Sequence, residues 1–171
     1  MPTLRAIEAG SGPGIVLLHG VGVGVETFEL VAADLATDHR VAVLERPGSA
    51  GTPVPLADQA DQLAQAITDR FGSDALVVGV SGGATLALLV GMRHPGIARS
   101  MVAHEPLVGP LAPDLHRRFA AIAERADRSD DDALAVVRAV MGPMSWTGLE
   151  PSTRALIEAR AAWVRAEVPL F

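Results

Sequence analysis

The 171-residue sequence predicts an α/β fold in which a mostly parallel sheet carries helices on both faces. Short, unbroken apolar runs alternate with helical patterns along the first 110 residues, and such runs are typical of strands buried on both faces. Beyond about residue 113 only helical patterns are visible. Strands that alternate with helices form right-handed β-α-β units, so a mostly parallel sheet with a helical segment after it is expected.

The first expected elements lie within the amino-terminal 44 residues. Residues 4–8 alternate apolar and polar side chains, as an edge strand does. A glycine-proline turn then leads into the continuous apolar run 15–18, which predicts a buried strand. Residues 28–35 have the spacing of a helix, and 41–44 form a second buried strand.

The next elements follow a loop rich in glycine and proline. Residues 56–71 place Leu56, Leu63 and Phe71 on one face of an amphipathic helix. A third buried strand at 75–78, a tight turn at 79–83 and an apolar helix at 84–92 come next. A fourth short strand is expected at 100–103, and further helices at 114–126, 129–141 and 151–167.

Composition limits the possible classes of protein. With 49% hydrophobic and 20% charged residues, the chain is not intrinsically disordered. The net charge of −6 argues against a nucleic-acid partner. The absence of cysteine excludes disulfides and a thiolate nucleophile, and the absence of lysine excludes a P-loop. We expect a core at 1–110 and a helical cap at 111–171, in a cytoplasmic protein without a membrane span.

The motif that carries chemistry is Gly79-Val80-Ser81-Gly82-Gly83, a G-x-S-x-G pattern. It follows a buried strand directly and opens a buried helix, which is the setting of a nucleophile elbow. The sharp turn strains the serine backbone, and glycines on either side let neighbouring chain pass close by. We therefore predict that Ser81 is a nucleophile, rather than part of a phosphate-binding or plain packing turn.

A second loop supplies candidate partners for that serine. His19 and Gly20 end the strand expected beside the elbow strand. The backbone amides of Val21 and Gly82 are predicted to form an oxyanion hole, because amides at such positions favour a developing negative charge. His19 is expected to tie down this loop by hydrogen bonds rather than to act as a base. Bound substrate is expected to contact His19 and Gly20.

These motifs together resemble those of the α/β-hydrolase fold family of serine esterases, lipases and C–C hydrolases. The segment 45–52 is similar to the family's D-R-P-G-x-G-x-S loop, although Glu45, Ala50 and Thr52 replace Asp, Gly and Ser. The resemblance covers about residues 10–110, and the matching segments occur in family order: Val16-Leu17-Leu18-His19-Gly20, Glu45-Arg46-Pro47-Gly48-Ser49-Ala50-Gly51-Thr52, Val78-Gly79-Val80-Ser81-Gly82-Gly83 and Val102-Ala103-His104-Glu105-Pro106.

The resemblance also implies a triad whose acid and histidine usually follow the family's seventh and eighth strands. Phe171 falls inside the expected cap, so we expect the chain to be part of a longer hydrolase. The alternative is a short protein whose bare apolar sheet edge pairs with a partner or a second copy. Within the chain, His104 and Glu105 are the candidate base and acid, because some family members resemble this arrangement by placing the acid after the sixth strand.

The expected reaction is cleavage of an ester, thioester, lactone or C–C bond through an acyl-enzyme on Ser81, with neither metal nor cofactor. Met141, Met144 and Trp146 are expected to line a pocket for a small apolar acyl or aromatic substrate, or else to pack the cap. A catalytically incomplete binding module is the alternative function. A dinucleotide-binding fold is disfavoured because Val25 occupies the position of the fingerprint's third glycine.

Overall fold

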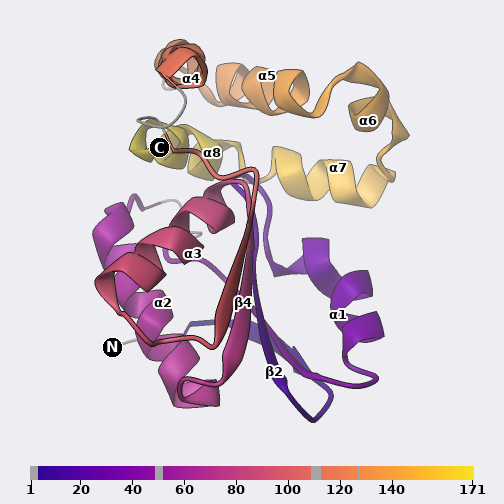
Figure 1. Cartoon of the computed structure of the whole chain (residues 1–171). Helices are drawn as coiled ribbons and strands as arrows, with labels where there is room; N and C mark the ends of the chain where they lie inside the picture. Colours follow the sequence, from indigo (N-terminus) through magenta and orange to yellow (C-terminus); the bar gives the residue numbers. More distant parts are fainter. Residues whose placement is uncertain (1–3, 49–51, 109–112, 127) are drawn as a thin grey trace. The chain divides into compact units, whose positions relative to one another are not determined.

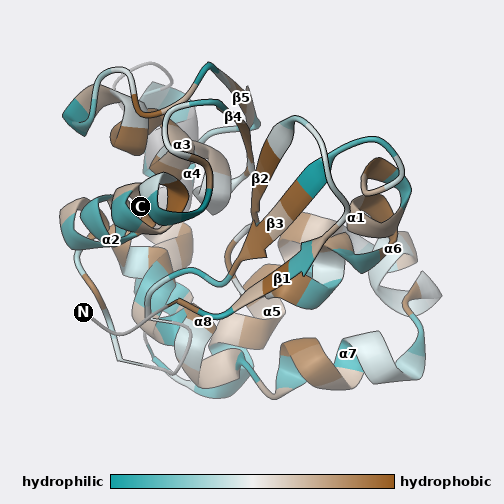
Figure 2. Ribbon diagram, turned by 90° about the horizontal axis from the view of Figure 1, so that it is seen from below, coloured by the Kyte–Doolittle hydropathy of each residue, from teal (hydrophilic) through white to brown (hydrophobic). Residues whose placement is uncertain are grey.

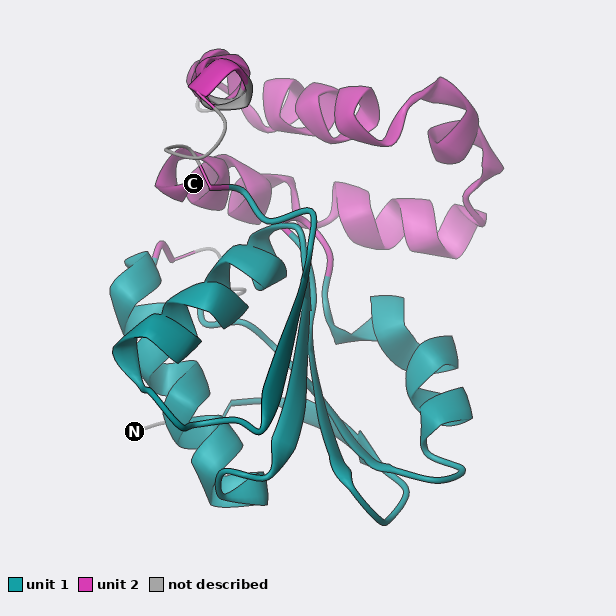
Figure 3. Ribbon diagram, viewed as in Figure 1, with its two compact units in different colours: residues 1–20, 24–49, 54–107 teal, residues 21–23, 50–53, 108–171 magenta. Residues whose placement is uncertain are grey.

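The computed structural model describes residues 4–48, 52–108, 113–126 and 128–171. They form two compact units (Figure 3). The first comprises Met1–Gly20, Gly24–Ser49 and Val54–Leu107, and the second comprises Val21–Val23, Ala50–Pro53 and Val108–Phe171. The boundary predicted between residues 110 and 111 lies outside the described residues.

A mixed sheet with strand order β1-β3-β2-β4-β5 is the centre of the first unit (Figure 1). Only β1 is antiparallel to its neighbour, so the prediction of a mostly parallel sheet is confirmed. Each strand lies within about two residues of its predicted position. The strands are β1 (Ala6–Ala9), β2 (Gly14–Leu18), β3 (Arg40–Leu44), β4 (Ala75–Val80) and β5 (Ser100–His104).

Helices cover both faces of this sheet. On one face lie α1 (Glu29–Leu35) and the short 3-10 helix η1 (Val25–Phe28), and on the other lie α2 (Leu56–Phe71) and α3 (Gly82–Arg93) (Figure 1). The predicted helix 28–35 is therefore partly a 3-10 turn, whereas the predicted bounds of α2 are confirmed.

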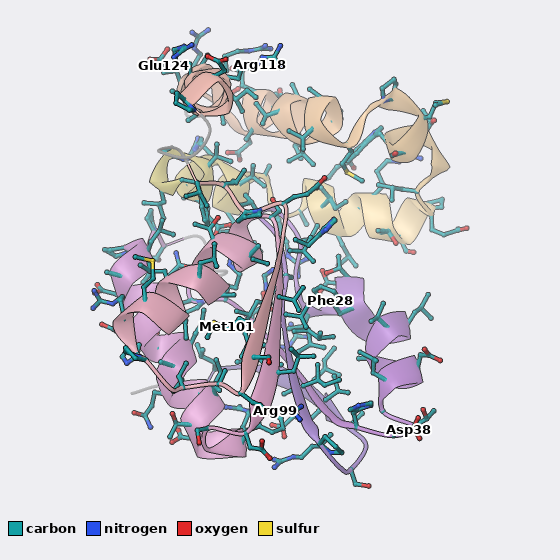
Figure 4. All side chains as sticks on the ribbon, viewed as in Figure 1. Phe28, Asp38, Arg99, Met101, Arg118 and Glu124 are labelled. Carbon is teal, nitrogen blue, oxygen red and sulfur yellow. The ribbon has the colours of Figure 1, made fainter. Side chains whose placement is uncertain are left out.

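Alternate side chains of the strands enter two separate apolar clusters. Val16 and Leu18 of β2 pack toward α2 and α3, whereas Ile15 and Leu17 pack toward α1. Figure 2 shows β2 and β3 as strongly apolar ribbons, and in Figure 4 Met101 and Phe28 lie on opposite sides of the sheet. Burial on both faces explains why these strands are continuous apolar runs in the sequence.

The strand β5 has β4 as its single neighbour among the described residues. Its burial alternates between half-buried and exposed, and Val102 is 48% exposed. An open apolar edge of this kind was predicted for the last strand. Pairing of the edge with a second copy of the chain stays a prediction.

The ends of α2 and α3 are joined by a polar contact on the surface. Both Arg93 (Nε, 2.9 Å; Nη2, 2.7 Å) and His94 (Nε2, 2.7 Å) contact the carboxylate of Asp61. The hydrogen bond from Arg93, followed by that from His94, lowers the pKa of Asp61 to about 2. These bonds favour the charged carboxylate and tie the end of α3 to the first turns of α2.

The second unit is helical in its described residues. One prediction here is wrong: residues 151–167 form two helices, and the Arg160 N–H donates to the Ile157 carbonyl (3.0 Å) where α7 ends. A further helix, α6, was not predicted, although Gly142 (φ 80°) and Pro143 mark its start. The helices are α4 (Pro113–Ala126), α5 (Asp130–Met141), α6 (Pro143–Gly148), α7 (Pro151–Glu158) and α8 (Ala161–Glu167), with the 3-10 turn η3 (Val168–Leu170) at the end.

The break between α7 and α8 has a packing consequence. Ile157 enters a cluster with Leu134 and Ala161, whereas Val164 enters a different cluster, with Ala133. In one straight helix Ile157 and Val164, which are two turns apart, would lie on the same face. The break between α7 and α8 turns them toward different clusters. None of the helices in the described ranges combines the length and the hydropathy of a membrane span.

Candidate active site

Ser81 links β4, the inner strand between β2 and β5, to α3 in a conformation that few residues adopt. Its φ is 54° and its ψ is −122°, and it is the N-cap residue of α3. A non-glycine residue in this region carries about 1–3 kcal/mol of strain and persists only where its surroundings hold it. The Ser81 N–H donates to the His104 carbonyl (2.8 Å), and its carbonyl accepts from the N–H groups of Ala84 (2.8 Å) and Thr85 (3.1 Å).

The glycines on either side of Ser81 are required by close approach of backbone. A Cβ atom on Gly79 would lie 2.5 Å from the Gly83 carbonyl carbon, and one on Gly83 would lie 2.5 Å from the His19 carbonyl oxygen. Both distances are shorter than any real Cβ contact. The G-x-S-x-G spacing therefore lets the start of α3 pack directly against the ends of β2 and β4.

Gly20 brings the loop after β2 beside the serine. Because β2 and β4 are paired in parallel, with Leu18 opposite Gly79, the residues that follow each strand emerge at the same sheet edge. A Cβ atom on Gly20 would lie 3.4 Å from the Ser81 Cβ and 3.9 Å from its Oγ. The absence of a side chain at position 20 therefore leaves space next to the hydroxyl.

His19 is fully buried and bonds to the backbone around it. Its Nε2 accepts from the Arg46 N–H (3.2 Å), so Nδ1 carries the hydrogen and donates to the Gly20 carbonyl (3.0 Å). Burial lowers the pKa of His19, which favours this neutral form. In a trans peptide the carbonyl and the N–H point in opposite directions, so the bond to the Gly20 carbonyl also orients the Val21 N–H.

The buried residues Glu45 and Arg46 complete this polar cluster. The Arg46 guanidinium donates to the His19 carbonyl (3.2 Å), and Glu45 Oε1 lies 3.5 Å from His19 Nε2. Burial lowers the pKa of Arg46 to about 9, and the Glu45 carboxylate opposes that shift. The matched segment 45–52 thus supports the loop next to Ser81, although its residues 49–51 lie outside the described residues.

On the other side of Ser81, His104 is the last residue of the edge strand β5 and Glu105 follows it. His104 pairs in register with Val80, but its side chain is 66% exposed and that of Glu105 is 79% exposed. The His104 Nε2 and Glu105 Oε2 atoms are 4.0 Å apart. Glu105 also has a positive φ of 54°. The sequence analysis missed Thr85, whose hydroxyl bonds to both backbone groups of Leu107.

The remaining predicted site residues belong to the second unit. Met141 and Trp146 pack against its apolar cluster, whereas Met144 is 86% exposed. The guanidinium groups of Arg138 and Arg154 lie 5.0 and 5.9 Å from the centre of the Trp146 ring. Packing within the unit accounts for Met141 and Trp146, and contact of these residues with substrate stays a prediction. Val21 also belongs to this unit.

No cluster of three metal-ligating side chains is present among the residues that the structure describes. A serine held in a strained turn between an inner parallel strand and a helix, with glycines packed on both sides, is a signature of the α/β-hydrolase fold. The family profile described as "Alpha/beta hydrolase family" matches residues 15–171. The chain belongs to this family.

Relatives with curated descriptions include esterases. The chain is 36% identical over 92 residues to a pimeloyl-[acyl-carrier protein] methyl ester esterase of Chromobacterium violaceum, a match that covers 54% of this chain and 36% of that protein. It is 33% identical over 109 residues to the uncharacterized hydrolase YraK of Bacillus subtilis, covering 58% and 39%. The matched region thus spans well under half the length of these relatives.

Solved structures agree with the fold. Naproxen esterase from Bacillus subtilis is similar with a TM-score of 0.72 at 17% identity, covering 94% of this chain and 57% of that one. A hydrolase from Pseudomonas aeruginosa gives a TM-score of 0.72 at 18% identity, covering 95% and 66%. At these identities the likeness establishes the fold.

Proposed function

We propose that the protein is a serine hydrolase that cleaves a small apolar ester through an acyl-enzyme on Ser81. The observation that carries this proposal is the strained Ser81 backbone, held from both sides by hydrogen bonds and packed between Gly79 and Gly83. Such strain persists where the surroundings over-determine it, and it is concentrated at functional sites. The esterase relatives support an ester as the substrate class, with thioester, lactone and C–C cleavage as related possibilities.

In the proposed reaction the Ser81 hydroxyl attacks the substrate carbonyl and loses its proton to a base. The tetrahedral intermediate carries a negative charge, which the N–H groups of Gly82 and Val21 stabilise. Collapse of this intermediate expels the alcohol and leaves an acyl-serine, and water then releases the acid. Acyl transfer of this kind needs a base and donors rather than a cofactor.

The mechanism needs a general base that accepts the proton of the Ser81 hydroxyl. His104 is the candidate base within this chain and Glu105 its candidate acid, because His104 ends the strand next to Ser81 and Glu105 follows it. Their side chains are exposed, and 4.0 Å separates their nearest polar atoms. A general base must come within about 2.6–3.2 Å of the hydroxyl when substrate is bound. A His104→Ala variant therefore separates a base in this chain from one supplied by other sequence.

The first experiment is labelling with a fluorophosphonate probe, followed by intact mass and peptide mapping. We expect one adduct, on Ser81, and none in Ser81→Ala. Ser145→Ala, which removes an exposed serine of the second unit, serves as the control and should label like wild type. Loss of labelling in His104→Ala would assign the base to this chain.

A folded wild-type protein that takes no label would contradict the proposal. It would favour the second candidate function, a hydrolase-fold module that binds a ligand without cleaving it. The exposed positions of His104 and Glu105 are the observation that favours this second function. A binding module would keep its ligand affinity in Ser81→Ala.

A further inference from the structure

Two non-glycine residues have a positive φ among those described, Ser81 and Glu105, both with φ 54°. They follow neighbouring strands, Ser81 after β4 and Glu105 after β5, so both lie at the same edge of the sheet. Nothing in the residue type of Glu105 favours this conformation, since the left-handed region is favourable mainly for glycine and asparagine. The surrounding contacts must therefore hold it there.

The contacts around these two residues close into a ring. The Ser81 N–H donates to the His104 carbonyl (2.8 Å), and the Thr85 N–H donates to the Ser81 carbonyl (3.1 Å). The Thr85 hydroxyl accepts from the Leu107 N–H (2.8 Å) and donates to the Leu107 carbonyl (3.1 Å). The backbone from 104 to 107 joins the two ends. We call this closed path the elbow ring.

We propose that Thr85 is a positioning residue for Ser81. Its hydroxyl holds Leu107, which keeps Glu105 in the left-handed conformation and so fixes the His104 carbonyl to which the Ser81 N–H donates. A hydroxyl can donate and accept at once, which no apolar side chain of the same size can do. The catalytic consequence rests on the proposed function of Ser81, whereas the structural coupling does not.

The direct test of the coupling is amide hydrogen exchange. Thr85→Val removes the hydroxyl at nearly constant size, and Thr85→Ser keeps it. Loss of one hydrogen bond raises the population of the open state, from which an amide exchanges, by roughly tenfold. We therefore expect the Leu107 amide to exchange about tenfold faster in Thr85→Val. The Ser81 amide, which does not touch the Thr85 side chain, should exchange about three- to tenfold faster. Both should stay at wild-type rates in Thr85→Ser.

Two further variants strengthen the test. Thr85→Ala also lacks the hydroxyl, and it gives a second measurement if the added valine methyl prevents folding. Glu105→Gly removes the strain at position 105, because glycine adopts a positive φ freely. In the Glu105→Gly background, Thr85→Val should accelerate Ser81 exchange by less than half as much. Amides of Val16 and Leu17 in β2 are the internal control and should not change.

The result that would overturn the proposal is faster exchange at Leu107 with an unchanged Ser81 amide. That outcome would mean that the Thr85 hydroxyl stabilises only the segment after β5 and does not affect Ser81. Fluorophosphonate labelling adds the catalytic readout: Thr85→Val should label about tenfold more slowly and Thr85→Ser at the wild-type rate. Unlabelled wild-type protein would contradict the proposed function, and the exchange rates would still decide the coupling.

Discussion

Adding one methyl group to Gly83 tests whether the elbow depends on close approach of backbone. The new Cβ would lie 2.5 Å from the His19 carbonyl oxygen and 2.7 Å from the Leu18 carbonyl carbon. Both are backbone atoms of the β2 end, so relief requires movement of β2 or of the start of α3. Overpacking of this kind costs about 1–3 kcal/mol. Replacing glycine by alanine in a helix stabilises the fold by about 0.5–1 kcal/mol, which offsets part of this cost. Gly83→Ala should therefore lower the free energy of unfolding by about 1–2 kcal/mol.

Gly91→Ala is the matched control in the same helix. Its Cβ would lie 2.7 Å from the Met101 sulfur, which is part of a flexible side chain that can move away. The gain in helix propensity offsets the cost of moving that side chain, so Gly91→Ala should change stability by less than about 0.5 kcal/mol.

Urea unfolding followed by circular dichroism measures both variants. With an m-value of about 2 kcal/mol/M, Gly83→Ala should shift the midpoint down by roughly 0.5–1 M. Equal midpoints for Gly83→Ala and Gly91→Ala would refute the reasoning, because they would show that backbone at the elbow yields as easily as a methionine side chain.

Two further predictions concern polar contacts. Asp61→Asn should lower the urea midpoint at pH 7, because the hydrogen bonds from Arg93 and then His94 hold the Asp61 pKa at about 2. A lowered carboxyl pKa stabilises the folded state above the unfolded pKa, so the difference from wild type should shrink as pH falls from about 4 toward 2; a constant difference would contradict this. Ser129→Ala should destabilise the second unit by about 1 kcal/mol, whereas Ser129→Thr should not, because the Ser129 hydroxyl caps α5 by accepting from the Asp132 N–H (3.1 Å) and also donates to the Asp132 carboxylate (3.1 Å), and threonine keeps that hydroxyl. Near-ultraviolet circular dichroism, which reports Trp146 and Trp163 of that unit, follows its unfolding, and equal midpoints for Ser129→Ala and wild type would reject the cap.

Much of the fold could be predicted because its signals are local. The amphipathic pattern of α2 and the apolar runs of β2, β3 and β4 each report burial within one element. The elbow could be predicted because the close contact between the backbones of Gly79 and Gly83 lies within five residues, so it appears in the sequence as a fixed spacing of two glycines. The break at Arg160 has no such signal, since it follows from which cluster each side chain must enter.

The sequence predicted that His19 bonds within its own loop, but the long-range partners that support the site could not be predicted, because they are distant in the sequence. Thr85 and Leu107 meet only once β4 and β5 are paired, and His19 reaches the Arg46 backbone only through the pairing of β2 with β3. A threonine in the first turn of a helix and a glutamate after a strand are ordinary in a sequence. Their roles depend on a positive φ at Glu105 that its residue type does not indicate.

The strand order also has a kinetic consequence. β2 pairs with β4 across roughly sixty residues of chain. Pairing over such a separation is slow, because the chain loses the entropy of closing this loop before the contacts between the strands stabilise it. The surroundings that force Ser81 into its strained conformation do not exist until that pairing is complete. During refolding from urea, labelling of Ser81 by a fluorophosphonate should therefore appear later than helix formation. Its rate would report when β2 and β4 pair.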